Sequence, residues 1–143
     1  MTTFLGLIDE NGNYYEAEHN ITGATEVSKR PSPYHDWVDG TWVERTEERL
    51  NAERSKIRAD LTSAVQVHLD ETAKSSGYDN IVSACSYAGA ANPFQAEGSA
   101  FVVWRGAVWA ACYAILAEVE AGSRAIPSAV ELLTALPVLS LPE

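Results

Sequence analysis

Cysteine and basic residues are scarce in this chain of 143 residues. Its two cysteines, Cys85 and Cys112, form no CxxC pair and no dense framework, which is typical of proteins made in a reducing compartment. Ten Lys and Arg stand against twenty Asp and Glu, for a formal charge of −10. That charge repels a phosphate backbone. We therefore expect neither nucleic acid nor an anionic membrane surface as a partner.

Long hydrophobic runs and an export signal are also missing. The most apolar stretch, residues 100–117, is interrupted by Arg105, and the uninterrupted run 106–117 has twelve residues. This run is too short to cross the hydrocarbon of a bilayer, so we expect a buried helix and no membrane insertion. The start, MTTFLGLIDENG, has no basic segment and no small-residue cleavage site. The expected location is the cytoplasm.

Familiar catalytic and metal-binding motifs are missing as well. The sequence contains no GxSxG, no glycine-rich phosphate loop and no HExxH. His68 falls in the apolar register of a helix without a second ligand at helical spacing, and we interpret it as a hydrogen-bonded interior residue. Cys85 and Cys112 have no adjacent His or Lys to lower their pKa and are interpreted as small core side chains. We predict no catalytic residue, no metal and no cofactor.

The composition changes near residue 43. The first 43 residues hold six of the thirteen aromatics and two turn-forming pairs, Asn11-Gly12 and Asp39-Gly40. Such pairs favour the type I′ turn, whose twist matches that of paired strands. We therefore predict two hairpins, in which residues 4–9 pair with 14–19 and residues 37–38 pair with 41–42.

The second hairpin places Trp37 opposite Trp42, so that the two indoles should touch. Between the hairpins, Pro31 and Pro33 restrict the residues before them to extended conformations. An extended segment is therefore predicted over residues 29–34.

After residue 43 the apolar residues recur at spacings of three, four and seven, which indicates helices. Four helices are predicted, over about 46–74, 79–88, 93–121 and 128–135. The third is apolar around nearly its whole circumference, which predicts a central helix covered on several sides. The apolar tail that follows the fourth helix is suited to lie across a groove. The expected fold class is α+β, with a β-hairpin and extended segment over 1–43 and an all-α helical module over 44–143.

Arg105 interrupts the most apolar of these helices. Burying an unpaired guanidinium costs several kcal/mol, so the sequence predicts a carboxylate partner. The candidates are Asp79, with which we expect a structural ion pair, and Asp70 and Glu71 at the end of the first helix. The functional alternative is an arginine that binds the carboxylate of a ligand.

The N-terminal aromatics allow two interpretations. Hairpins alone are marginally stable, so their aromatic side chains must pack on something. They either pack against the predicted helix over 93–121 of the same chain or bind a partner chain, for which Trp and Tyr are favoured anchors. The candidate partner-binding residues are Tyr14, Tyr15, Tyr34, Trp37 and Trp42.

Several blocks of the sequence resemble phage tail proteins. ArgProSerProTyrHisAspTrpValAspGlyThrTrpVal (30–43), followed by a charged helix, resembles a recurrent segment of phage tail fibre assembly proteins. A helical C-terminal module of phage tail-associated proteins is similar to HisLeuAspGluThrAlaLysSerSerGlyTyrAsp (68–79), SerTyrAlaGly (86–89), AlaPheValValTrpArgGlyAlaValTrpAla (100–110) and GluAlaGlySerArgAlaIleProSer (120–128). These blocks are spread from residue 30 to residue 128, and so over most of the length of the chain.

This resemblance implies a non-enzymatic protein that binds a tail fibre in the host cytoplasm, as an assembly chaperone, a retained virion subunit, or both. The implied partner is a tail fibre or another tail protein, and self-association of the chain stays open. One alternative is a purely structural connector of the tail or baseplate. The other is a small enzyme with a cleft around Arg105, His68 and Asp79.

Overall fold

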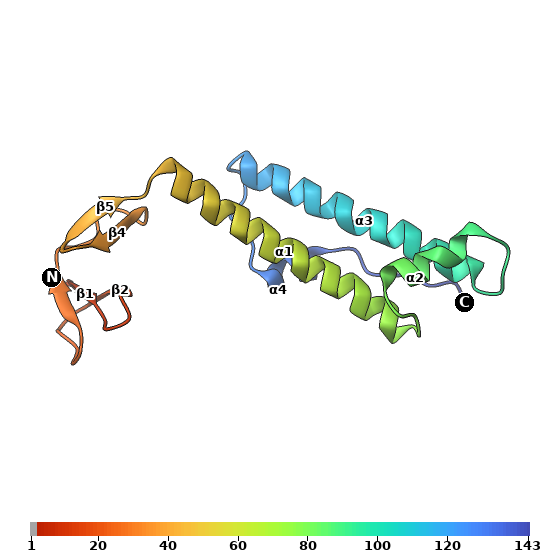
Figure 1. Cartoon of the computed structure of the whole chain (residues 1–143), viewed down its shortest axis with the longest axis horizontal. Coiled ribbons are helices and arrows are strands. Elements are labelled where there is room, and N and C mark those ends of the chain that lie inside the picture. The colour runs from red at the N-terminus through yellow and green to blue at the C-terminus, as the bar shows by residue number, and fades with distance from the viewer. Residues whose placement is uncertain (1–2) are drawn as a thin grey trace. The chain divides into compact units, whose positions relative to one another are not determined.

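The computed structural model describes residues 3–143, which form five strands in two small sheets followed by four α-helices and a short 3₁₀ helix (Figure 1). The α+β class is confirmed. By its contacts the chain divides into two compact units, an N-terminal unit ending at Arg54 and a helical unit, Ser55–Glu143. The boundary expected between residues 43 and 44 therefore lies eleven residues further along the chain.

The first sheet contains β1 (Leu5–Ile8), β2 (Tyr14–Ala17) and β3 (Thr25–Val27) in the order β2-β1-β3, all antiparallel. The predicted first hairpin is confirmed, although its turn is not type I′. Gly12 has a positive φ of 84° and donates to the Asp9 carbonyl at 3.0 Å, while Asn11 keeps a negative φ. The third strand was not predicted, because it is short and lacks alternation.

The second sheet is the hairpin of β4 (His35–Val38) and β5 (Thr41–Glu44). Asp39 and Gly40 have φ values of 47° and 82°, as a type I′ turn requires. The predicted register is also confirmed. The segment expected to be extended over 29–34 instead bends before the hairpin, where the His35 N–H donates to the Ser32 carbonyl at 3.2 Å.

Helix α1 (Glu47–Ser75) ends in a Schellman motif. Gly77, with φ of 93°, donates to the Lys74 carbonyl, and Tyr78 donates to the Ala73 carbonyl. The first turns of α1 belong to the N-terminal unit because ion pairs tie them to the second sheet. Arg45 bridges Asp36 at 3.2 Å and Glu53 at 2.9 Å, and Arg49 also pairs with Asp36. These contacts explain why the division between the units falls inside α1.

The helical unit contains the rest of α1, α2 (Ile81–Ser86), the 3₁₀ helix η1 (Tyr87–Gly89), α3 (Gln95–Glu120) and α4 (Ala129–Ala135). All four predicted helices are present. Within this unit α3 runs beside the second half of α1 (Figure 1). The buried core comprises Val65, Leu69, Ala73, Ile81, Ala84, Phe101, Trp104, Val108, Ile115, Leu132 and Leu136.

Helix α3 corrects one expectation. It was predicted to be covered on several sides, but its buried residues, Gly98, Phe101, Trp104, Val108 and Ile115, all lie on one face. The opposite face is exposed although it is apolar. An all-round apolar composition therefore does not guarantee all-round burial in so small a unit.

Candidate partner-binding site

Three of the five candidate residues form one aromatic cluster in the N-terminal unit: Tyr14, Trp37 and Trp42. The ring of Trp42 lies 5.0 Å from that of Trp37 and 5.0 Å from that of Tyr14, both in edge-to-face geometry. The contact predicted between the two indoles is confirmed. Because Tyr14 lies on β2 and the indoles lie on β4 and β5, the cluster joins the two sheets.

Hydrogen bonds hold this cluster in place. The Trp42 indole N–H donates to the Ser28 carbonyl at 2.8 Å, and the Arg30 N–H donates to the Tyr14 hydroxyl at 3.1 Å. The Arg30 guanidinium also lies 5.0 Å from the centre of the Tyr14 ring. Burial raises the pKa of the Tyr14 phenol. These side chains are half-buried and stabilise the unit itself.

The other face of the β4–β5 hairpin is more open. Side chains alternate along a strand, so Val38 and Val43 lie on the face opposite the two indoles. Both are nearly half exposed, and Tyr34, just before β4, is 58% exposed. We call Tyr34, Val38 and Val43 the exposed hairpin face. Sequence reasoning identified only Tyr34, because isolated valines in a hairpin carry no signal of exposure.

Tyr15, the fifth candidate, lies on β2 opposite Leu7 of β1 and is half-buried. Leu7 is fully buried and forms the small core of the first sheet. Tyr15 is therefore placed with the first sheet, apart from the exposed hairpin face.

A groove of about 320 Å³ opens within the N-terminal unit, over the aromatic cluster. Its lining combines aromatic rings with charged and amide groups: Ile8, Gly12, Asn13, Tyr14, Arg30, His35, Asp36, Trp37, Trp42 and Arg45. Asp36 is already neutralised by Arg45 and Arg49. Among residues 3–143, no three His, Cys, Asp or Glu side chains gather as a metal site would require.

The predicted ion pair of Arg105 with Asp79 is wrong: in the described part of the chain Arg105 has no carboxylate within 4.0 Å, and Asp79 is exposed. The arginine is half-buried beside Cys85 and acts on Asp70 only through its charge. Burial raises the pKa of the Cys85 thiol, and Arg105 opposes that shift. The partial exposure of Arg105 removes the need for a paired carboxylate.

Asp70 has a different partner. Its carboxylate accepts the Ile81 N–H at 3.0 Å and the Gln66 amide at 3.3 Å, which links the end of α1 to the start of α2. The hydrogen bond from Ile81 is the largest cause of its lowered pKa. This link between helices is a structural contact that the sequence pattern could not identify.

The sequence also suggested a cleft around Arg105, His68 and Asp79. These residues line neither the groove over the aromatic cluster nor a second groove, which lies between α3 and the C-terminal tail. The imidazole of His68 lies 5.8 Å from the ring of Trp104, edge to face.

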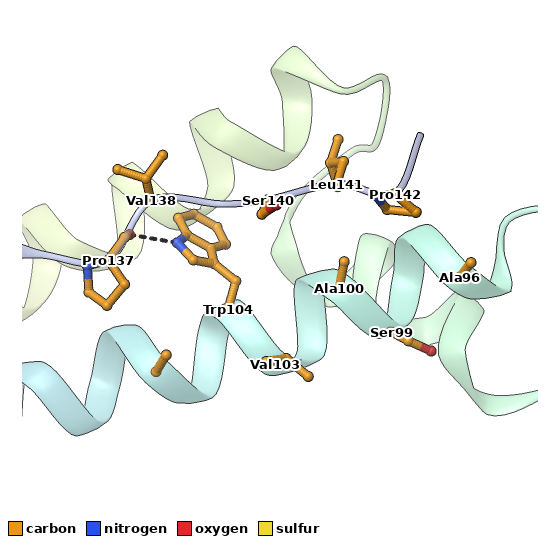
Figure 2. A pocket seen from close by; sticks show the side chains of 11 residues that line it. Ala96, Ser99, Ala100, Val103, Trp104, Pro137, Val138, Ser140, Leu141 and Pro142 are labelled. Carbon is orange, nitrogen blue, oxygen red and sulfur yellow. Dashed lines mark hydrogen bonds between the residues drawn. The ribbon is translucent and has the colours of Figure 1, made fainter.

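A second groove, of about 560 Å³, lies between α3 and the C-terminal tail and is mostly apolar (Figure 2). The Trp104 indole stands between the two segments and donates to the Pro137 carbonyl at 2.8 Å. Leu136 is buried and Leu139 packs on the core. The tail therefore lies along α3 and forms one side of this open groove, whereas the sequence suggested a segment that lies across a groove.

No protein-family model, curated protein or solved structure matches this chain. Within residues 3–143, one helix, α3, is long and apolar enough to span a membrane by length and composition, a criterion that core helices of soluble proteins also meet. Only 22% of its most apolar window is buried. This exposed apolar surface needs a separate explanation.

Proposed function

We propose that this protein is a non-enzymatic phage tail protein that binds a tail fibre, as an assembly chaperone, a retained virion subunit, or both. The phage assignment comes from the resemblance of residues 30–43 and of the helical blocks. The N-terminal unit supplies the binding surface, and the helical unit carries the larger hydrophobic core.

The observation that supports this proposal best is the difference between the two faces of the β4–β5 hairpin, one of which packs on the unit while the other is exposed. One face buries Trp37 and Trp42 in the aromatic cluster, which rigidifies the hairpin. The other face presents Tyr34, Val38 and Val43 to solvent. A rigid platform with a protruding tyrosine and two aliphatic side chains is suited to a protein partner, because little entropy is lost when it binds.

The connector alternative is favoured by a different observation. Helix α1 runs without a break through both compact units, and each unit has exposed apolar side chains of its own. A chain of this kind could hold two tail components at once. Mass spectrometry of purified virions distinguishes a retained connector, present in fixed stoichiometry, from a chaperone that leaves after assembly.

Co-purification with the tail fibre protein tests the binding surface. We expect the double variant Tyr34→Ala/Val43→Ser to weaken fibre binding at least tenfold, about 1.4 kcal/mol, because exposed apolar anchors contribute to affinity rather than to folding. The matched control is Val67→Ser/Val82→Ser, which removes two exposed valines from the helical unit. Equal fibre binding by both variants would contradict the assignment.

A further inference from the structure

Arg30 is the one charged side chain that lines the groove over the aromatic cluster without a partner of opposite charge in the described part of the chain. The other two, Asp36 and Arg45, pair with each other at 3.2 Å. Each also has a second partner on α1, Arg49 for the aspartate and Glu53 for the arginine. Among residues 3–143, only the backbone N–H of Arg30 donates a hydrogen bond to another residue. The N–H groups of its guanidinium are therefore available to a ligand.

Tyr14 holds this arginine in place through both its backbone and its side chain. The Arg30 backbone N–H donates to the Tyr14 hydroxyl at 3.1 Å, and the guanidinium carbon lies 5.0 Å from the centre of the same ring. An aromatic ring attracts the cation electrostatically and forms no hydrogen bond with its N–H groups. The contact therefore positions the donors of Arg30 without occupying them. A half-buried arginine that is already positioned loses less entropy when it binds a ligand.

Two further carboxylates bond to residues that line the groove, and neither pairs with Arg30. Asp9 accepts the Asn13 backbone N–H at 2.8 Å and the Asn13 side-chain amide at 3.1 Å. Glu16 accepts the Tyr14 hydroxyl at 2.9 Å. These carboxylates prevent the surroundings of the groove from being strongly positive. The groove therefore suits a ligand group with one negative charge better than a doubly charged phosphate.

From these observations we propose that the groove over the aromatic cluster binds a glutamate or aspartate side chain, which stands between apolar residues in a segment of a partner protein. Arg30 is the residue that binds the carboxylate. The groove shares no lining residue with the exposed hairpin face. The proposal does not require that the partner be a tail fibre, and its failure would leave the fibre proposal untouched.

The geometry of arginine favours a carboxylate as the bound group. The planar fork of N–H donors on a guanidinium matches the two oxygens of a carboxylate, so that two parallel hydrogen bonds form. Arg105 also has no carboxylate within 4.0 Å in the described chain, but it lines neither groove. The argument therefore applies to Arg30, which combines available donors with a groove that can admit a ligand.

The size of the groove and its other walls favour a protein segment over a free small molecule. Its volume of about 320 Å³ lies at the lower end of the range for small-molecule pockets, and one side chain with part of a neighbour can fill it. Trp37, Trp42 and Ile8 line the groove together with Arg30 and offer apolar surface to the residues beside the carboxylate. Aromatic residues and arginine are enriched where proteins bind one another.

Titration of the full, isotope-labelled chain with the peptide acetyl-Leu-Glu-Leu-amide tests the proposal by nuclear magnetic resonance. We expect the signals of the Arg30 Nε–H and the Trp37 indole N–H to shift. The dissociation constant should be lower by roughly tenfold or more than for acetyl-Leu-Gln-Leu-amide, which lacks the charge. Arg30→Gln should abolish this preference. The matched control is Arg58→Gln, which changes an exposed arginine of α1 and should keep the preference.

A second variant separates binding from folding. Arg30→Lys keeps the positive charge beside Tyr14 but loses the planar fork, so it should stay folded and bind the glutamate peptide several-fold more weakly. The Trp42 indole N–H signal, whose donor bonds to the Ser28 carbonyl, checks the fold of each variant. Equal binding of the two peptides would overturn the proposal, as would a preference that survives in Arg30→Gln or the absence of shifts up to about 10 mM peptide. Glutarate that binds as tightly as the glutamate peptide would instead show a site for a free carboxylic acid and overturn the assignment to a protein segment.

Discussion

Trp42 shows how a residue selected as a binding anchor can prove to be a structural one. Its ring packs against both Trp37 and Tyr14, and its indole nitrogen is satisfied by the Ser28 carbonyl. Replacing it would separate the two sheets before it affected any partner. At this scale Tyr34 is the better probe of binding, since it is exposed and its removal leaves the cluster intact.

Asp70 should make the stability of the helical unit depend on pH. Its pKa lies below the ordinary 3.8 because the Ile81 N–H stabilises the charged carboxylate. The stabilisation is therefore complete above that value and is lost as the pH falls through the lowered pKa. We expect Asp70→Ala to lower the free energy of unfolding by about 1 kcal/mol at neutral pH.

Urea denaturation at neutral pH and near pH 2 provides the measurement. The difference between wild type and Asp70→Ala should shrink at the lower pH, because protonation of the wild-type carboxyl weakens its hydrogen bond with the Ile81 N–H. Asp60→Ala, which removes an exposed carboxylate paired with Lys56, should change stability by less than about 0.5 kcal/mol. A constant difference across this pH range would contradict the role assigned to Asp70.

At the scale of elements, the two faces of α3 have different surroundings. Its inner face approaches η1 so closely that only glycine fits at position 98, where a Cβ would meet backbone atoms of Tyr87 and Ala88 at 2.7–3.0 Å. Its outer face has no neighbour in the described chain at Gly106. The fold of the chain thus explains the glycine at position 98 by a close contact, whereas no such contact accounts for Gly106.

Gly98→Ala should destabilise the helical unit by roughly 1–3 kcal/mol, because the new methyl group must push η1 away from α3. Gly89→Ala is the matched control, since its Cβ would meet nothing within 4 Å and its φ is not positive. Thermal unfolding followed by circular dichroism compares the two variants. Equal melting temperatures would show that the contact between η1 and α3 yields without cost.

At the scale of the whole molecule, different kinds of contact stabilise the two units. The helical unit has an eleven-residue core that draws on α1, α2, α3 and α4. The N-terminal unit has Leu7, the aromatic cluster, and the ion pairs of Asp36 with Arg45 and Arg49. Each set of contacts lies within its own unit, so the two should be separable.

A protein consisting of residues 55–143 should therefore remain helical and unfold cooperatively, and it should fail to co-purify with the tail fibre. Starting at Ser55 is preferable to starting at Glu44, because Arg45 and Arg49 make ion pairs with Asp36 of the second sheet. Circular dichroism and calorimetry test the fold, and co-purification tests binding. Normal fibre binding by this truncated protein would move the binding site to the helices.

The sequence by itself determined the local structure. Asp39-Gly40 is sufficient to specify its turn and hence the pairing of Trp37 with Trp42, because positive φ angles restrict which residues can occupy those positions. Gly77 likewise ends α1 close to the predicted boundary near residue 74, since few other residues tolerate the left-handed conformation. Turns and helix ends of this kind depend on a few consecutive residues, because the side chain and its own backbone are enough to determine the local conformation.

Only the tertiary structure decided which surfaces are buried. An apolar helix such as α3 could be covered on every side or on one, and the outcome depends on how many other elements the chain can supply. The lack of a carboxylate partner for Arg105 in the described chain and the third strand were missed for the same reason, since neither is determined by neighbours in sequence. The Asp70 carboxylate accepts a hydrogen bond from the Ile81 N–H. Arg105 is half-exposed, so that water can solvate its guanidinium without an ion pair to Asp79. Which distant segments come into contact depends on how all the segments of the chain pack together, and this cannot be derived from any one of them.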